Sequence, residues 1–398
     1  MNFPLLESKN QKEFELRLCK MRRAMETHNI DALLVASSVN LFYITGGVCR
    51  GYVYVCRDQE PLFFMIPPAE ATLSSEINIR KPEQIPEELE KRGYSLPKKI
   101  GLEFSDLLYN EVERLKNVFP EAEYADGSKV MREARLTKTE FEIACMREDG
   151  RKHCRAYSKI SGCYHPGMTD VEFQIAIERE LRLAGCLGFL RVAGSAMEIN
   201  MGSVIAGDNA EEPAPYDFTM GGAGVDPSLP VGASGLELKP GMSVMVDMNG
   251  GFNGYQTDMT RCWSLGELPD FALDAHACSI KILRELEKKA LPGIEIGELY
   301  RIASRIVKDC GFEDYFMGHS HKVKFIGHGI GIELNEAPVI MERNKALLEE
   351  NMVLAIEPKF VIPGVGAVGI ENTYVIRKEG LENLTPFEEE IMELRFRD

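Results

Sequence analysis

Two pairs of acidic residues interrupt apolar runs in the second half of the chain, and each pair flanks a glycine-containing turn. In residues 243–266 (SVMVDMNGGFNGYQTDMTRCWSLG), Asp247 and Asp258 lie on either side of a turn rich in Gly and Asn, which predicts a β-hairpin. With the hairpin centred between Phe252 and Asn253, the two carboxylates face each other, with Cβ atoms about 4.5–5.5 Å apart. Carboxylates this close repel each other unless a cation lies between them, so the pair suggests a metal site.

The second acidic pair repeats this geometry in residues 352–376 (MVLAIEPKFVIPGVGAVGIENTYVI). A hairpin centred on Gly364 places Glu357 opposite Glu371. Solvated charges on strands are common, so each acid alone has an ordinary structural explanation. Carboxylates within apolar runs are rare unless they are paired or bind a metal, and two opposed pairs on two hairpins favour the metal.

His328 completes the candidate ligand set. It lies in residues 325–338 (FIGHGIGIELNEAP), where glycines on both sides leave the imidazole uncovered. A lone histidine is more often a core or surface residue, but beside four carboxylates we expect a ligand. One His and four carboxylates form an oxygen-rich site suited to Mn, Fe, Co or Zn. If two of the five ligands bridge, the site holds two divalent ions about 3.5–4 Å apart, as in two-metal hydrolases.

The elements that position these residues belong to the second of two expected domains. The first third of the chain alternates helix-like and strand-like segments, which is typical of a self-contained α/β domain. A polar segment then leads into a helical stretch that ends near residue 160, and we place the domain boundary between residues 133 and 134. We expect helices over 11–28, 105–118, 169–185, 270–290 and 295–310, and strands over 31–37, 41–45, 52–56, 62–66 and 99–103.

Composition narrows the classes of function. The 398 residues carry a formal net charge of −16 and no basic cluster, so we expect no nucleic-acid partner. No apolar run approaches the roughly 18 residues that a membrane span needs. The first residues lack the basic start and apolar core of a signal peptide, and the ten cysteines form no Cys-x-x-Cys motif. We therefore expect a cytoplasmic protein with reduced thiols and no membrane association.

At these residues the chain resembles the pita-bread metallopeptidases, a family that includes methionine aminopeptidase, aminopeptidase P, prolidase and the metal-free creatinase. The resemblance lies in the run from Asp247 to Arg261, the GHGIG motif at 327–331, the pair Glu357-Pro358, and Glu371 before the final strand. It implies an α/β (α+β) fold with a creatinase-like N-terminal α/β domain (1–133) and a C-terminal pita-bread catalytic domain (134–398).

The resemblance also implies roles for the ligands. Asp247 would chelate one metal, and His328 and Glu357 would hold the other. Asp258 and Glu371 would bridge the two ions, and a metal-bound hydroxide would attack the scissile carbonyl. Glu357 would shuttle the proton to the leaving amine. The implied activity is that of a homodimeric exopeptidase on short peptides, of the Xaa-Pro aminopeptidase or dipeptidase type.

The substrate side departs from the family pattern. Asn335 and Lys324 stand where family members often have histidine, Gly369 where an Arg is frequent, and Val339 where prolidases often carry Arg. The candidate substrate-binding residues are therefore Asn335, Lys324, Ser203 (loosely matched to an upstream histidine) and Tyr255. The Gly/Pro-rich segment 206–233 precedes the first metal hairpin, so we expect it at the rim of the site.

Two alternatives to an exopeptidase remain. Loss of histidine and arginine weakens carboxylate recognition, which favours a small-molecule, metal-dependent C–N hydrolase or lyase on the same fold. A non-catalytic binding module is the second alternative, but the complete ligand set argues against it.

Overall fold

The chain folds into two compact units. The computed structural model describes residues 10–71, 73–194, 199–216 and 218–395. The units comprise Met1–Thr139 and Glu140–Asp398, so they divide six residues after the position expected from the sequence. The helical stretch expected to run to residue 160 is broken at this division, where α6 (Ser128–Leu136) ends and α7 (Glu140–Tyr157) begins. Among the described residues, no helix is both long and apolar enough to cross a membrane.

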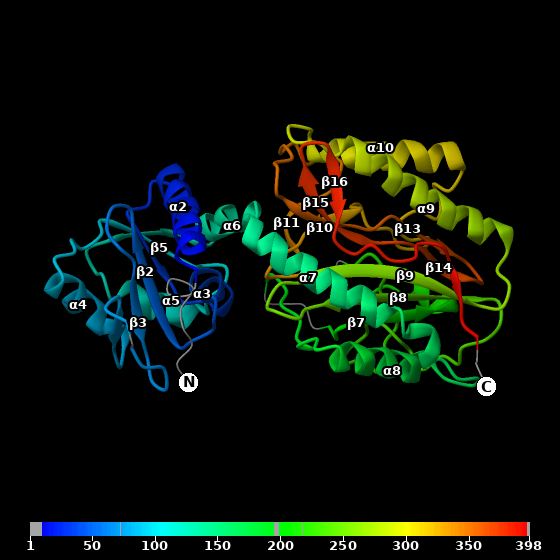
Figure 1. The fold of residues 1–398 in the computed structure, drawn as a ribbon, viewed down its shortest axis with the longest axis horizontal. Coiled ribbons are helices and arrows are strands. Elements are labelled where there is room, and N and C mark those ends of the chain that lie inside the picture. Colours follow the sequence, from blue (N-terminus) through cyan, green and yellow to red (C-terminus); the bar gives the residue numbers. More distant parts are fainter. Residues whose placement is uncertain (1–9, 72, 195–198, 217, 396–398) are drawn as a thin grey trace. The chain divides into compact units, whose positions relative to one another are not determined.

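The first unit is built on a six-stranded mixed sheet with the strand order β4-β3-β2-β1-β5-β6 (Figure 1). The central strand β1 pairs antiparallel with β2 and parallel with β5. Its four residues are all buried, as a strand covered on both faces requires. The strands are β1 (Ala32–Val35), β2 (Gly51–Cys56), β3 (Leu62–Met65), β4 (Glu76–Asn78), β5 (Lys99–Leu102) and β6 (Glu123–Asp126).

One element of this unit was predicted wrongly. Residues 41–45 were expected to form a strand but lie in α3 (Ser38–Thr45). The side chain of Ser37 accepts a hydrogen bond from the backbone N–H of Asn40 and caps the helix. A five-residue apolar run has the same pattern in a buried helix as in a buried strand, so periodicity alone could not separate them. The other helices are α2 (Gln11–Thr27), η1 (Pro82–Gln84), α4 (Ile85–Lys91) and α5 (Tyr109–Lys116).

The second unit places strands between two pairs of helices. Helices α7 and α8 contact β7, β8 and β9 on one side, whereas α9 contacts β13, β14 and β16 on the other and packs with α10 (Figure 1). The strands form three sheets, ordered β17-β9-β8-β7, β11-β10-β12-β15-β16 and β13-β14. The helices are α8 (Asp170–Leu183), α9 (Asp270–Lys289), α10 (Ile296–Cys310), η2 (Ile160–Cys163) and η3 (Gly207–Glu211).

The strand boundaries of this unit match the expected hairpins. Strands β8 and β9 form the first hairpin, and β12–β13 and β14–β15 supply the two arms of the second. The strands are β7 (Gly202–Ala206), β8 (Met242–Gly250), β9 (Thr257–Leu265), β10 (Gly327–Gly329), β11 (Glu336–Val339), β12 (Val353–Ile356), β13 (Lys359–Ile362), β14 (Gly366–Gly369), β15 (Asn372–Arg377), β16 (Gly380–Asn383) and β17 (Met392–Glu393).

The register of the β8–β9 hairpin differs from the expected one by two residues. Asp247 lies opposite Thr260, and Asn249 lies opposite Asp258. The turn is centred between Asn253 and Gly254, and Gly254 adopts a φ of +98°, which a side chain disfavours. Side chains alternate along a strand, so a shift of two residues keeps both carboxylates on one face. The two acids are therefore diagonal neighbours and not direct partners.

The register of the second hairpin agrees with the prediction. Lys359 pairs with Gly369 in one ladder, and Ile356 pairs with Asn372 in the next. Both ladders have the same register, which places Glu357 opposite Glu371 where the strands pass from the two-stranded sheet to the five-stranded sheet.

A buried arginine fixes the two hairpins to each other. Arg261 is fully buried, and its Nη1 donates to the carbonyl oxygens of Thr260 (2.8 Å) and Glu371 (2.7 Å). Its Nη2 donates to Asn372 Oδ1 at 2.7 Å. The backbone N–H of Glu371 also donates to Thr260 O at 3.2 Å. Because a buried guanidinium is stable only with its hydrogen bonds made, these contacts define how β9 meets β15.

Helix α7 carries a buried histidine, His153, that packs against the first hairpin. The His153 side chain is fully buried and lies 3.1 Å from Thr257 Oγ1 through Nδ1. Burial lowers the pKa of His153 to about 3, and the charge of Arg261 adds to the effect. The folded protein therefore keeps this imidazole neutral at pH values where the unfolded chain, with a pKa near 6.5, binds a proton.

We predict that His153 destabilises the protein as the pH falls below about 6.5, because only the unfolded state is then protonated there. Between pH 7.5 and pH 5.0 the wild type should lose about 2 kcal/mol more unfolding free energy than His153→Gln. Denaturant unfolding of both proteins at the two pH values measures this difference. Equal losses would show that His153 is protonated in the folded state.

Candidate metal centre

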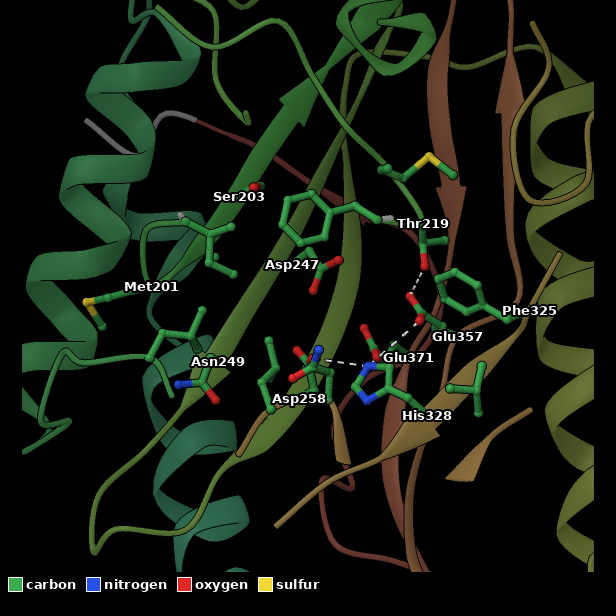
Figure 2. Close-up of a pocket in the computed structure, with 18 of the residues that line it drawn as sticks. Met201, Ser203, Thr219, Asp247, Asn249, Asp258, Phe325, His328, Glu357 and Glu371 are labelled. Atoms are coloured by element: carbon green, nitrogen blue, oxygen red, sulfur yellow. Dashed lines mark hydrogen bonds and ion pairs between the residues drawn. The ribbon is translucent and has the colours of Figure 1, made fainter. Parts of the chain in front are cut away.

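The second unit encloses a cavity of about 260 Å³. Most of its wall is apolar, and its acidic residues and His328 gather where the two hairpins meet (Figure 2). This is the common form of a small-molecule or peptide site. The lining residues are Leu190, Ile199, Met201, Gly202, Ser203, Phe218, Thr219, Met220, Asp247, Asn249, Asp258, Phe325, His328, Leu334, Asn335, Val339, Met341, Glu357 and Glu371.

All five predicted ligands line this cavity and point toward one another (Figure 2). His328 Nε2 lies 3.9 Å from Asp258 Oδ2 and 3.9 Å from Glu357 Oε1. One ligand atom each from Asp258, His328 and Glu371 lie within 4.8 Å of one another. The same limit holds for Asp247, Glu357 and Glu371, so Glu371 belongs to both groups.

The glycines around His328 permit the close approach that the ligand needs. A Cβ on Gly327 would lie 2.2 Å from the carbonyl oxygen of Ala355, and one on Gly329 would lie 2.0 Å from that of Ala337. His328 Nδ1 lies 3.0 Å from Gly329 O. A proton on Nδ1 satisfies this contact and leaves Nε2 as the atom available to a metal.

One carboxylate oxygen of Glu371 accepts a hydrogen bond, and the other is available to a ligand. Thr260 Oγ1 donates to Glu371 Oε2 at 2.7 Å. Glu371 Oε1 is buried and has no hydrogen-bond partner among the described residues. A buried acceptor without a partner is costly, and a cation would satisfy it.

Burial makes the charged forms of two of the carboxyls unfavourable. It raises the pKa of Asp258 well above its usual range, and the negative charge of Asp247 raises it further. Burial likewise raises the pKa of Glu371, and the charge of Asp258 adds to that shift. Both groups therefore need a cation to stay ionised inside the pocket.

Lys359 is a member of the cluster that the sequence analysis missed. Its Nζ donates to Asp247 Oδ2 at 2.7 Å, Glu357 Oε2 at 2.9 Å and Glu371 Oε2 at 3.3 Å. Burial alone would lower the pKa of Lys359, but its three carboxylate partners outweigh burial and hold the pKa well above the usual range. Lys359 follows Glu357 by two residues in the arm of the expected hairpin, and this spacing could have revealed it.

Thr219 was also missed. Its Oγ1 donates to Glu357 Oε2 at 2.5 Å, and it lies with Phe218 and Met220 on the wall of the cavity. These three residues belong to the 206–233 segment, which therefore reaches the site as expected. Because an isolated threonine in a long loop carries no local pattern, only the fold could identify it.

The structure brings together some of the expected substrate residues and separates others. Ser203 and Asn335 line the cavity, and Asn335 Oδ1 also accepts a hydrogen bond from the N–H of Ala193 at 2.7 Å. Lys324 and Tyr255 are not among the lining residues. Lys324 is exposed, and Tyr255 is buried with its hydroxyl donating to Glu142 Oε1 at 3.2 Å. The geometry therefore gives Tyr255 a contact with helix α7 and none with the cavity.

The donor set fits a divalent metal ion. Carboxylate oxygens and one imidazole nitrogen are the ligands that Mn, Fe, Co and Zn share. The unpartnered Glu371 Oε1 and the available Nε2 of His328 belong to one compact group with Asp258.

Comparison with protein families agrees with this site. The model of metallopeptidase family M24 matches residues 144–378, which include every candidate ligand. The model of the creatinase/prolidase N-terminal domain matches residues 17–137. The second unit is thus a pita-bread domain that follows a creatinase-like domain, as the sequence predicts.

Individual proteins match along nearly the whole chain. The Xaa-Pro dipeptidase of Pyrococcus furiosus is 29% identical over 94% of this chain and 99% of its own length. The Xaa-Pro dipeptidase of Lactobacillus delbrueckii is 26% identical over 94% and 98%. Among solved structures, an Xaa-Pro dipeptidase from Bacillus anthracis aligns with a TM-score of 0.79 at 23% identity, covering 96% of this chain and 100% of its own. An X-Pro aminopeptidase from Thermotoga maritima gives 0.76 at 21% identity, with coverages of 93% and 99%.

We predict that Asp258→Asn abolishes metal binding and leaves the fold intact. The amide matches the carboxyl in shape, and the raised pKa of Asp258 means that little charge stabilisation is lost without metal. Added Mn²⁺ should raise the melting temperature of the wild type by several degrees, since it binds only the folded state. The variant should show no rise. The exposed Asp274→Asn serves as the matched control, and a full Mn²⁺ effect in Asp258→Asn would reject the ligand.

Proposed function

Because the chain belongs to metallopeptidase family M24, we propose that it is a metal-dependent exopeptidase that hydrolyses short peptides at Xaa-Pro bonds. The observation that carries the proposal is the convergence of four carboxylates and His328 in one largely apolar pocket. The Xaa-Pro dipeptidases that match the full chain support this substrate class.

His328 and three acidic residues around it are suited to hold the metal. Asp258, Glu357 and Glu371 present carboxylate oxygens to the imidazole, and we assign these three with His328 as ligands. When bound, a divalent cation polarises the scissile carbonyl and lowers the pKa of water. Mn, Co, Zn and Fe all accept such ligands, so the donor set leaves the choice among them open.

Glu357 is suited to move the proton. Thr219 and Lys359 both hold its Oε2, so the carboxylate is fixed with Oε1 toward His328. We infer that Glu357 accepts a proton from the attacking water and delivers it to the leaving amine. Thr219 and Lys359 act on the reaction only by positioning this carboxylate.

The apolar wall is suited to the side chains of a short peptide. Met201, Phe218 and Phe325 line the cavity from three different segments, and their surfaces match a pyrrolidine ring or an aliphatic side chain. Asn249 Oδ1 is buried without a hydrogen-bond partner among the described residues, so it can accept from a peptide N–H. Asn335 and Ser203 add polar contacts at the wall.

The alternative small-molecule hydrolase or lyase receives less support. Its basis was the altered substrate side, and of the four residues concerned Asn335 and Val339 line the cavity, whereas Lys324 and Gly369 do not. The relatives named above are peptidases, which favours a peptide substrate. That the enzyme is a cytoplasmic homodimer stays a prediction from the sequence.

We predict that the purified enzyme, supplied with Mn²⁺, Co²⁺ or Zn²⁺, hydrolyses Xaa-Pro peptides and loses this activity in the presence of a chelator. A panel of Xaa-Pro dipeptides, Xaa-Pro-Xaa tripeptides and matched Xaa-Ala peptides measures the preference. Cleavage of Xaa-Ala at an equal rate would contradict the proline preference. Metal binding without cleavage of any peptide would contradict the peptidase assignment.

The charge of the cavity wall leads to a prediction about the length of the peptide. No described residue that lines the cavity is Lys or Arg, so the free carboxylate of a dipeptide lacks a charged partner there. Val339 lies opposite His328 in the β10–β11 ladder and lines the cavity. Val339→Arg should raise kcat/KM for an Xaa-Pro dipeptide about tenfold relative to its C-terminal amide, since a charge-assisted hydrogen bond stabilises by about 1.5–3 kcal/mol. Val339→Met is the control, and an unchanged ratio in the arginine variant would reject this assignment.

A further inference from the structure

The ammonium of Lys359 lies inside the carboxylate cluster, where it contacts three of the four acids. Its Nζ is 2.7 Å from Asp247 Oδ2, 2.9 Å from Glu357 Oε2 and 3.3 Å from Glu371 Oε2. The Lys359 side chain is completely buried, and these carboxylates are its only hydrogen-bond partners through Nζ among the described residues. A buried lysine with three acidic partners is a fixed cation.

The three partners of Lys359 are one of the two groups that could hold a metal ion. Asp247, Glu357 and Glu371 offer ligand oxygens within 4.8 Å of one another. An ammonium bonded to all three occupies the space that a metal bound by this group would need. A metal there would lie in contact with the ammonium, and two cations at that distance repel strongly in a buried site.

The second group remains available. Glu357 and Glu371 turn Oε2 to Lys359, whereas Glu357 Oε1 lies 3.9 Å from His328 Nε2. Glu371 Oε1 has no partner among the described residues. The shared carboxylates therefore divide their oxygens between the ammonium on one side and the His328 group on the other.

Lys359 pairs with Gly369 across the β13–β14 ladder. A Cβ on Gly369 would lie 2.6 Å from the carbonyl oxygen of Pro358 and 2.8 Å from Lys359 Cα, so the close approach of the two backbones requires glycine at 369. This requirement gives a physical reason for one of the departures from the family pattern. The cation expected at position 369 is absent, and a cation stands directly across the ladder.

We propose that Lys359 takes the place of one of the two expected metal ions, so that the centre binds a single divalent cation through Asp258, His328, Glu357 and Glu371. This inference rests on the ligand set of the proposed function and replaces the two ions expected from the sequence by one. Asp247 then serves as a partner of the ammonium and not as a metal ligand. The lysine places a positive charge against the shared carboxylates, 2.9 Å from Glu357 Oε2 and 3.3 Å from Glu371 Oε2.

The test is a count of bound Mn²⁺. The full-length protein is freed of metal with a chelator, titrated with Mn²⁺ in a calorimeter, and analysed for bound metal after gel filtration. Electron paramagnetic resonance of the loaded protein separates an isolated ion from two ions about 3.5–4 Å apart, because the latter are exchange-coupled. We expect one Mn²⁺ per wild-type chain and an uncoupled spectrum.

The variant Lys359→Met tests whether the lysine is what limits the centre to one ion. Methionine keeps an unbranched apolar stem and removes the charge, so we expect a second Mn²⁺ per chain and a coupled spectrum. The matched control is Lys345→Met at an exposed lysine, which should bind one ion like the wild type. If the methionine variant folds only with metal present, it is prepared in Mn²⁺, and the wild-type count still decides the proposal.

Either of two metal counts would contradict the inference. Two Mn²⁺ per wild-type chain would show that Lys359 excludes no metal, and one Mn²⁺ in Lys359→Met would show that another feature does. Xaa-Pro hydrolysis measured on the same samples separates this result from the proposed function. One ion without cleavage rejects the substrate class and keeps the count, whereas two ions with cleavage reject the count and keep the function.

Discussion

The structure of the second unit depends on the electrostatic repulsion among four carboxylates that share one partly buried pocket. In water such charges are screened, but here burial raises the pKa of Asp258 and of Glu371, and the negative charges of neighbouring carboxylates raise both further. The fold must therefore supply positive charge and hydrogen-bond donors at this place. Lys359 supplies the charge, and Thr219 and Thr260 supply hydroxyl donors.

The surrounding architecture keeps these groups in register. The two hairpins meet where Arg261 bonds the carbonyl oxygens of both, and the helices on either side hold the strands in place. The arginine never reaches the cavity, yet it sets the distance between Thr260 and Glu371. The buried guanidinium of Arg261 therefore supports the backbone of Glu371, whose carboxylate is assigned to the metal.

The sequence predicts the ligand positions well because each acid breaks an apolar run and each glycine beside His328 marks a close approach. It predicts the register of the first hairpin less well, since the conformation at Gly254 is invisible in a residue count. Lys359 is not predicted from the ligand pattern, because that pattern consists of acids and histidine, and a positively charged lysine does not bind a metal ion. The helix at α3 was missed because a short apolar run has the same appearance in two structures.

The β8–β9 hairpin also limits how related chains can vary. The face on which Asp247 and Asp258 lie depends on the register of the ladder, in which Asp247 lies opposite Thr260. On the opposite face, Val246 and Met248 pack into the core with Tyr157. A slip of two residues in this register preserves both faces, whereas a slip of one turns an acid toward the core. The connection between Gly250 and Thr257 can therefore vary in length only as far as it preserves this pairing.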